Sequence, residues 1–418
     1  MIAASFNDAW LIDGVRTPFA DYNGALAAVS PIDLGIKVAR EALKRAGASP
    51  ADVGTVIAGS MAQASFDAYM LPRHIGLYAG VPVEVPAHQV QRVCGTGIEV
   101  IMQAADAVSL GRVALALCVG TESMSRNPIA AYTHRSGFRM GQIEFKDFLW
   151  EALRDPSADA TMGDTAENLA RQYQIARPDV DAYAARSFAR AISAKDNGFL
   201  GGEIAAVTSE SFEADGLKPR GIKIKDSEVT ADTHIRPSPL ESLAKIKPAF
   251  GGVQTGGNSS AIVDGAASVL VGSADYAKKN AKRNGKPPLA RIICGAAVGV
   301  PPEIMGIGPV PAINAVLARA GLKLSDIGRF EINEAFGAQV MACARELGLD
   351  EDKLNVNGGA IAIGHPLGAT GIRLALTLSR ELKRSGERYG IASACIGGGQ
   401  GIALLIENPA AAPAARKN

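Results

Sequence analysis

The 418-residue chain has almost no net charge and few aromatic residues. Its 43 basic and 42 acidic side chains give a formal charge of +1, which argues against a general attraction to nucleic acid or to an anionic membrane. No apolar run approaches the about 18 residues that a membrane-spanning helix needs. Met1 to Phe6 lack a basic segment and are typical of a strand, so we expect no signal peptide.

Cysteine and histidine are also scarce, with five of each. Five cysteines is an odd number without disulfide-framework spacing, which favours a reducing compartment, and we expect the cytoplasm of a bacterium. No Cys/His cluster has zinc-ligand spacing, and no Gly-x-x-x-x-Gly-Lys-Ser/Thr loop is present. We therefore expect no metal and no tightly bound cofactor. Cys118, Cys294 and Cys343 lie in apolar or helical surroundings and are interpreted as structural.

Glycine, by contrast, is abundant, at 46 residues where average usage gives about 29. Much of the excess falls in four short segments, which are 94–97, 251–265, 357–371 and 397–401. The same segments contain the residues that could carry chemistry. We therefore expect a narrow channel lined by backbone, where N–H groups hold developing charge.

The chain also repeats itself. Arg45-Ala46-Gly47 and Arg319-Ala320-Gly321 each end an amphipathic pattern with a glycine cap before an apolar strand. Cys94-Gly95-Thr96-Gly97-Ile98 and Gly368-Ala369-Thr370-Gly371-Ile372 match at the same spacing, and each opens a helix. We infer a duplicated α/β unit. If the halves pack about a pseudo-twofold axis, the two helix N-termini can face one another.

The domain boundaries follow from this duplication. We expect a first half at residues 1–122 and 251–285, a large insertion at 123–250, a second half at 286–408 and a disordered tail at 409–418. The insertion has helical patterns and is close to charge-neutral.

Two residues are candidates for covalent catalysis. Cys94 precedes a helix, whose N-terminus favours thiolate over thiol, although a buried structural cysteine is the alternative. His365 lies just before the equivalent position of the second half, so the pair could meet across the interface as nucleophile and base. The alternative for His365 is a turn residue that caps a helix.

Three further segments could serve the same site. Cys395 precedes Gly397-Gly398-Gly399, where we expect an accessible thiol and loop N–H groups that bind an oxyanion. Asn333-Glu334 follows an apolar strand and is either part of a site or a helix N-cap. Gly256 to Ser260 is rich in small residues and is either a path for a narrow ligand or a tight loop.

Together these motifs resemble the thiolase family over nearly the whole chain, from Val15-Arg16-Thr17-Pro18-Phe19 to the Cys395 loop. The Cys-Gly-x-Gly, Asn-Glu-Ala-Phe, Gly-His-Pro-x-Gly-Ala-Thr-Gly and Cys-x-Gly-Gly-Gly-x-Gly elements occur in family order. The resemblance implies two βαβαβαββ halves in five αβαβα layers, with an inserted loop domain. It also implies a homodimer or homotetramer that acts on acyl-CoA, with coenzyme A as substrate or product.

The resemblance assigns roles to residues of this chain. Cys94 is the acylated nucleophile, His365 its base, and Cys395 the acid or base at the α-carbon of acetyl-CoA. Asn333 holds a water that forms one oxyanion hole with His365, and the backbone N–H groups of Cys94 and Gly397 form the other. The implied contacts with the acyl and pantetheine chain are Ser260, Phe336, Met162 and Gly256.

The implied reaction is reversible, CoA-dependent cleavage of 3-oxoacyl-CoA, or condensation of two acetyl-CoA, by a ping-pong route. The stretch from Met140 to Asn168 resembles short-chain acetoacetyl-CoA thiolases, although Thr161 stands where those have histidine. The stretch from Ile235 to Leu240 resembles degradative 3-ketoacyl-CoA thiolases. We favour short chains, with a longer-chain thiolase of β-oxidation as the alternative.

Other readings account for fewer of these features. A ketoacyl-carrier-protein synthase would lack the cysteine at Cys395, and a cysteine protease explains neither Cys395 nor the duplication. An inactive acyl-CoA- or lipid-binding relative would not need all four catalytic positions intact.

Overall fold

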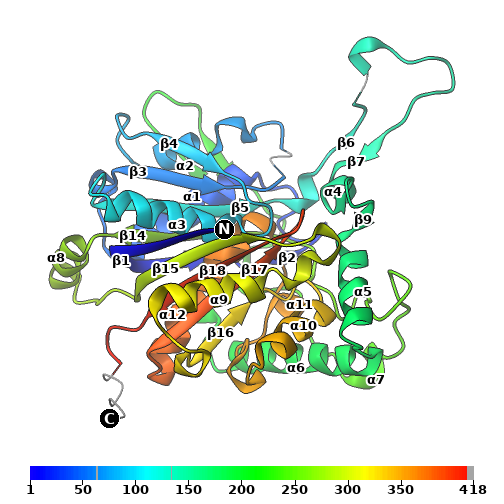
Figure 1. The fold of residues 1–418 in the computed structure, drawn as a ribbon. Coiled ribbons are helices and arrows are strands. Elements are labelled where there is room, and N and C mark those ends of the chain that lie inside the picture. The colour runs from blue at the N-terminus through cyan, green and yellow to red at the C-terminus, as the bar shows by residue number, and fades with distance from the viewer. Residues whose placement is uncertain (63–64, 133, 412–418) are drawn as a thin grey trace, which may run out of the picture.

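The computed structural model describes residues 1–62, 65–132 and 134–411. Its centre is a mixed sheet with strand order β16-β17-β18-β15-β1-β14-β5-β3-β4, and β2 pairs with β14 (Figure 1). The strands are β1 (Ile2–Arg16), β2 (Ala20–Asp21), β3 (Thr55–Gly59), β4 (Ala87–Val90), β5 (Leu115–Glu122), β14 (Val263–Gly272), β15 (Ala290–Gly299), β16 (Arg329–Ile332), β17 (Tyr389–Ile396) and β18 (Gln400–Glu407). The long strand β1 joins two sub-sheets, because it pairs with β15 through its first part and with β14 through its second.

Helices cover both outer faces and fill the space between the sub-sheets. α1 and α2 pack on the outer face of the first sub-sheet, and α9 packs on β15 and β18 of the second. α3 and α12 contact each other and strands of both sub-sheets, so they form the middle layer. The five-layer αβαβα arrangement that the resemblance implies is confirmed. The helices are α1 (Pro31–Ala46), α2 (Leu71–Tyr78), α3 (Thr96–Ser109), α8 (Ala274–Asn284), α9 (Pro309–Ala320), α10 (Gly337–Leu347), α11 (Ala360–Ile363) and α12 (Leu367–Ser385).

The two halves repeat local structure where the sequence repeats. α1 and α9 both end at a glycine in the left-handed region, Gly47 with φ 59° and Gly321 with φ 66°. The middle helices meet at the second matched pair. A Cβ on Gly97 would lie 2.6 Å from Ile372 N, and one on Gly371 would lie 2.2 Å from Ile98 N. Only glycine at both positions allows this backbone-to-backbone crossing near both N-termini.

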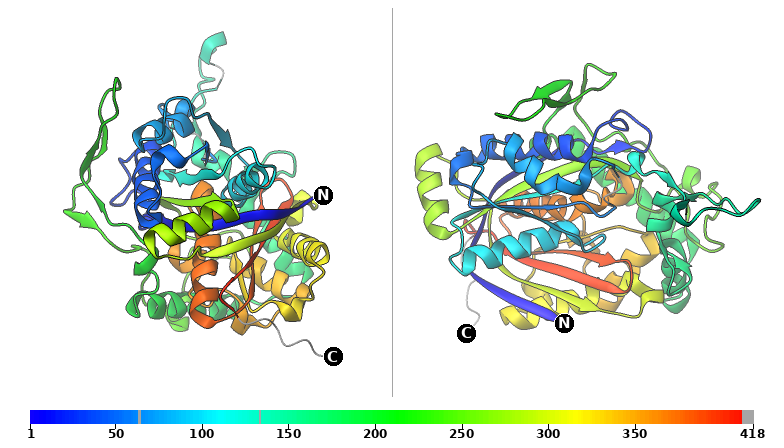
Figure 2. Two further views of the ribbon diagram at one scale, coloured as in Figure 1. Left: turned by 90° about the vertical axis from the view of Figure 1, so that its left-hand side faces the viewer. Right: turned by 90° about the horizontal axis from the view of Figure 1, so that it is seen from above.

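The segment between the halves contacts both of them. Its helices α5 and α6 pack against α10 and α11 of the second half, and its strand β12 lies on α1 of the first. The short pair β6–β7 begins an arm that projects from the body (Figures 1 and 2). The elements are β6 (Ile129–Ala130), β7 (Lys146–Asp147), α4 (Phe148–Ala152), β8 (Arg154–Asp155), β9 (Ala160–Thr161), α5 (Met162–Gln172), α6 (Arg177–Asp196), β10 (Val207–Thr208), β11 (Glu210–Phe212), β12 (Arg220–Ile222), β13 (Glu228–Val229) and α7 (Leu240–Leu243).

The C-terminal end is anchored up to Asn408. This residue is buried, and its side-chain amide donates to the carbonyls of Leu382 and Glu387. Residues 409–411 form a turn after it, and residues 412–418 of the expected tail lie outside the described residues. In the described part of the chain, no helix is both long enough and apolar enough to cross a bilayer.

Candidate active site

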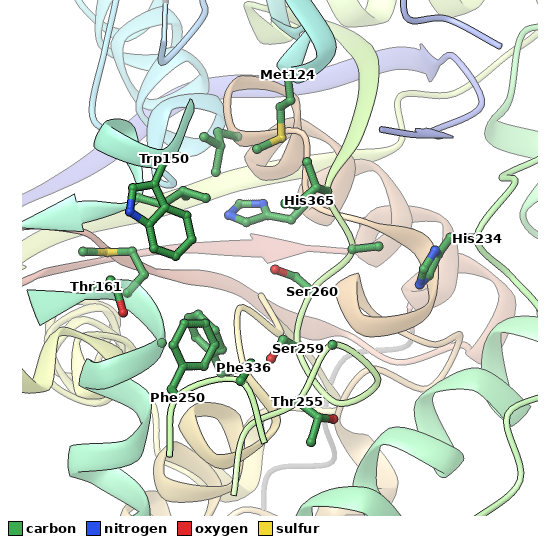
Figure 3. Close-up of a pocket in the computed structure, with 18 residues that line it drawn as sticks. Met124, Trp150, Thr161, His234, Phe250, Thr255, Ser259, Ser260, Phe336 and His365 are labelled. Carbon is green, nitrogen blue, oxygen red and sulfur yellow. The ribbon is translucent and has the colours of Figure 1, made fainter. Parts of the chain in front are cut away.

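A cavity of about 410 Å³ opens where the insertion meets the two halves (Figure 3). Its volume is within the range of small-molecule sites, and its walls are mostly apolar. It is lined by Met124, Trp150, Leu153, Thr161, Met162, Gly163, His234, Ala249, Phe250, Thr255, Gly256, Ser259, Ser260, Ala261, Ile262, Phe336, His365 and Leu367. Of the predicted site residues, His365, Ser260, Phe336, Met162 and Gly256 are among them.

Cys94 lies beside this cavity in the turn that precedes α3. The turn is held by Thr96, whose hydroxyl donates to Val93 O and accepts from the N–H of Arg92. Val93 adopts a φ of 43°, which is unusual for a β-branched residue and reflects how tightly the turn is constrained. The thiol is 8% exposed, and Leu367 of the cavity wall belongs to the same apolar cluster.

The protonation state of Cys94 differs from the expectation. Burial raises the pKa of its thiol to about 11, although the backbone N–H groups of Gly397 and of Cys94 itself act in the opposite direction. The apolar cluster around the sulfur makes desolvation the larger effect. The prediction that the helix N-terminus favours thiolate at Cys94 is therefore wrong for the unliganded site. The cluster consists of Met61, Met124, Leu149 and Leu367.

His365 comes from the loop before α12. Gly364 takes a φ of 105° and lies against Val263, and the His365 N–H donates to Ala261 O at 3.0 Å. The ring Nδ1 lies 2.6 Å from Thr370 Oγ1, and Nε2 lies 3.3 Å from Asn333 Nδ2. Burial, with the charge of Arg373 second, lowers the pKa of His365 to about 3. The ring is therefore neutral at physiological pH.

Cys395 is not accessible, contrary to the expectation. It is near the end of β17, flanked by β16 and β18, and its side chain packs on Met305 and Ala335. Its exposed fraction is 0%. Burial raises its pKa well above the usual value, and neighbouring Cys94 adds to the effect. The sheet, rather than the glycine loop that follows, determines its surroundings.

The Asn333-Glu334 pair does not cap the helix that follows it. α10 begins at Gly337 with Phe336 as its N-cap residue, so neither polar residue caps it. Asn333 is fully buried, with its amide directed at His365, and its Oδ1 accepts no hydrogen bond from the described residues.

Glu334 connects this strand end to the neighbouring helices. Its carboxylate accepts from Tyr183 Oη and Ser187 Oγ of α6, from Asn355 Nδ2 and from the N–H of Ile361 in α11. Because α11 leads directly into the His365 loop, Glu334 holds Asn333 and that loop in one framework.

Other residues that line the cavity come from the segment 256–260 and from the Asn-Glu-Ala-Phe loop. The N–H of Ser260 donates to Ala335 O, and Ser259 forms a bridge with Phe336, so the small-residue segment lies along the Asn-Glu-Ala-Phe loop. Phe336 meets Phe250 edge to face at 6.2 Å (Figure 3). A Cβ on Gly256 would meet nothing within 4 Å.

Met162, at the start of α5, reaches over the glycine loop. A Cβ on Gly397 would lie 3.1 Å from its Sδ, and Met162 packs on the cluster that contains Cys395. It therefore connects the cavity wall to the buried cysteine.

Glycines contribute less to the cavity than expected. Most glycines of the four glycine-rich segments lie where the backbone packs closely on other backbone or on a side chain. Gly95 packs in this way against Ile396, and Gly368 against Thr121 O. Among the residues that the structure describes, only the glycines Gly163 and Gly256 line the cavity, whose walls are mainly apolar side chains. The predicted backbone-lined channel is therefore replaced by a side-chain-lined cavity with glycine-packed helices behind it.

Glu122 is a further buried polar residue beside these segments, and it was not among the residues predicted from the sequence. Its buried carboxylate accepts from Ser60 Oγ and from the N–H groups of Met61, Ala62 and Gly368, which ties the end of β5 to the first turn of α12. The same signal that pointed to Asn333, a polar residue directly after an apolar strand, was present at Glu122.

The chain matches the family models of the thiolase N-terminal domain over residues 9–275 and of the thiolase C-terminal domain over residues 286–408. The chain belongs to the thiolase family. The human mitochondrial 3-ketoacyl-CoA thiolase is 41% identical over 97% of this chain and 100% of that protein. Beta-ketothiolase BktB of Cupriavidus necator is 40% identical over 95% of this chain and 98% of that protein.

Solved structures agree with these relatives. The crystal structure of human mitochondrial 3-ketoacyl-CoA thiolase in complex with CoA superimposes with a TM-score of 0.90, at 40% identity, over 97% of this chain and 99% of that one. The acetyl-CoA acetyltransferase of Syntrophomonas wolfei gives a TM-score of 0.88 at 36% identity, over 97% and 100% of the chains. The chain is therefore an acyltransferase of thiolase type.

Proposed function

We propose that this thiolase catalyses the reversible, CoA-dependent cleavage of 3-oxoacyl-CoA, and in reverse the condensation of two acetyl-CoA, through an acyl group on Cys94. The observation that carries the proposal is the convergence of four chain segments. Asn333 Nδ2 lies 3.3 Å from His365 Nε2, Cys94 is near enough to Cys395 to raise its pKa, and Leu367, two residues after His365, shares the apolar cluster of Cys94. No single segment contains a complete site.

In the first half-reaction His365 acts as the base for the Cys94 thiol. His365 Nε2 takes the Cys94 proton as the sulfur attacks the 3-keto carbon, because neither group is charged at rest. The N–H groups of Cys94 and Gly397, which already approach the sulfur, and the His365 side of the site supply the two oxyanion holes. Each preset donor of this kind contributes about 3 kcal/mol.

Carbon–carbon cleavage then leaves a carbanion at the α-carbon of acetyl-CoA. The C2–C3 bonding electrons move to C2, which takes the proton of the Cys395 thiol, and acetyl-CoA departs. The high pKa of Cys395 keeps that proton available. Asn333 supports the enolate oxygen through a water molecule. This water donates one hydrogen bond to the enolate oxygen and one to Asn333 Oδ1, which is otherwise unpaired.

The second half-reaction returns the enzyme to its starting state. A CoA thiol gives its proton to the Cys395 thiolate and attacks the acyl carbonyl. The Cys94–carbonyl bond breaks, and the departing sulfur regains its proton from His365. Since acetyl-CoA leaves before this CoA reacts, we expect ping-pong kinetics.

The cavity fits the pantetheine arm of CoA. The apolar side chains of Met162 and Phe336 line the cavity together with the small residues Ser260 and Gly256. Arg236, whose guanidinium lies 3.1 Å from the Nδ1 of the lining residue His234, is exposed at this edge and suits a phosphate. CoA is a substrate or product in this proposal, and we expect no tightly bound cofactor.

Short acyl groups suit the space around Cys94 better than long ones. Met61, Met124 and Leu149 belong to the same buried apolar cluster as Cys94, so a long chain on the sulfur would have to displace buried side chains. The alternative is a longer-chain 3-ketoacyl-CoA thiolase, with Trp150 and Leu153 bounding a path for the chain. Thiolysis rates along a C4 to C16 series of 3-oxoacyl-CoA separate the two.

The test of the reaction is the intermediate itself. Purified enzyme mixed with acetoacetyl-CoA should gain one acetyl group on the Cys94 peptide by intact-protein and peptide mass spectrometry. Cys94→Ala should gain none, and Cys118→Ala, a buried cysteine away from the site, should behave as the wild type. Absence of an adduct on Cys94 would refute the proposal. A homodimer or homotetramer and a cytoplasmic location remain our expectations.

A further inference from the structure

Thr370 contacts the ring of His365 from the first turn of α12. The residue is fully buried, and its Oγ1 lies 2.6 Å from His365 Nδ1. The same oxygen lies 3.1 Å from the carbonyl oxygen of Pro366, four residues earlier in the chain. Both partners are positioned by the loop before α12, so the hydroxyl is held between two fixed groups.

The directions of these hydrogen bonds follow from what each atom can do. The single hydroxyl proton of Thr370 is assigned to Pro366 O, which can only accept. Thr370 Oγ1 then accepts from His365, which requires a proton on Nδ1.

The contact at Nε2, on the other side of the His365 ring, is consistent with the same tautomer. The side-chain amide of Asn333 approaches Nε2 at 3.3 Å through its Nδ2, which can only donate. Nε2 therefore has a lone pair, which accepts from this amide, and no proton. One tautomer, with the proton on Nδ1 and the lone pair on Nε2, satisfies both contacts.

We propose that Thr370 is a positioning residue of the thiolase reaction, which holds His365 as the Nδ1–H tautomer with its Nε2 lone pair available for the Cys94 proton. The inference rests on the proposed function of His365 as base. When Nε2 takes the sulfur proton the ring becomes an imidazolium, and Thr370 continues to accept from Nδ1–H. The ring therefore keeps its orientation throughout the proton transfer.

The group that orients the His365 base for the Cys94 thiol is the neutral hydroxyl of Thr370. A carboxylate in the same place would stabilise the imidazolium, whereas a hydroxyl fixes orientation and tautomer with little change in charge preference. Thr370 therefore leaves His365 able to return its proton to sulfur when the acyl group departs.

The kinetic test uses Thr370→Val and Thr370→Ser. Valine keeps the shape but cannot accept, so His365 Nδ1–H is left unsatisfied or the tautomer changes. We expect the acylation rate of Cys94 to fall by about 5- to 150-fold in Thr370→Val, the range equivalent to an unsatisfied buried donor, with KM within about twofold. Thr370→Ser should restore the rate to within about threefold of the wild type.

The second test reads the tautomer directly. Protonated and unprotonated ring nitrogens differ in ¹⁵N chemical shift, and the chain has only five histidines, so His365→Asn identifies the signals of His365. We expect the wild type to show a proton on Nδ1 and none on Nε2, and Thr370→Val to gain a population with the proton on Nε2.

Either of two results would overturn the proposal. One is an Nε2–H tautomer in the resting wild type, which would mean that Thr370 donates to Nδ1. The other is a Thr370→Val enzyme that folds and acylates Cys94 at the wild-type rate. The spectrum of the wild type decides the matter even if the valine variant does not fold. It is also independent of turnover, so it separates this inference from the proposed reaction.

Discussion

The unliganded site should contain a neutral Cys94 thiol rather than a thiolate–imidazolium pair. The pKa of Cys94 is raised to about 11 and that of His365 is lowered to about 3. Because the thiol has the higher pKa, the proton stays on the sulfur of Cys94 and not on the ring of His365. At pH 7 a thiol of pKa about 11 is ionised in about one molecule in ten thousand. A thiol with the ordinary value of 9.0 would be ionised in about one in a hundred.

The assay is alkylation of Cys94 by iodoacetamide across a pH range. Because only the thiolate reacts, the rate should rise about tenfold per pH unit from pH 6 to 9 without a plateau. Quantifying the alkylated Cys94 peptide by mass spectrometry isolates this residue from the four other buried cysteines. Absolute rates depend on access to the pocket, whereas the slope depends on ionisation alone.

His365→Asn is the matched control for this slope. In a neutral site the variant should show the same pH dependence as the wild type, because His365 holds no proton from Cys94 at rest. A wild-type plateau below pH 8 that disappears in His365→Asn would mean that the ion pair already exists. That result would refute the argument that desolvation outweighs the backbone N–H groups around the sulfur.

Two further predictions concern other parts of the molecule. Cys395→Ala should still accept an acetyl group on Cys94 from acetyl-CoA yet lose acetoacetyl-CoA synthesis, measured by the absorbance of the product; unchanged synthesis would exclude its proposed role. Gly371→Ala should lower the free energy of unfolding by at least about 2 kcal/mol, because its Cβ would lie 2.2 Å from Ile98 N. In the control Gly201→Ala, where a Cβ meets nothing within 4 Å, denaturant unfolding should change by less than about 0.5 kcal/mol.

Features with a local cause were predictable from the sequence. The glycine caps at Gly47 and Gly321 follow from the residues present at those positions. The fold class followed from the duplication and the family motifs together. Local pattern is sufficient here because capping and alternation depend on neighbours in the chain.

Burial at the site was not predictable, because it depends on segments distant in sequence. The glycine loop after Cys395 suggested an accessible thiol, but Met305 and Ala335 cover it. The helix after Cys94 suggested a thiolate, but Met61 and Leu149 make the surroundings apolar. In both cases packing from other parts of the chain outweighs the local effect of the backbone.

The shared strand β1 has a consequence for synthesis of the chain. Its two partners, β14 and β15, follow it by roughly 250 residues or more, and ribosomes add about 5–20 residues per second. β1 therefore spends on the order of 12 to 50 s outside the ribosome before either edge can be paired. During that interval an apolar strand is exposed, and a nascent-chain chaperone that shields it would determine how much of the newly made enzyme reaches the native state.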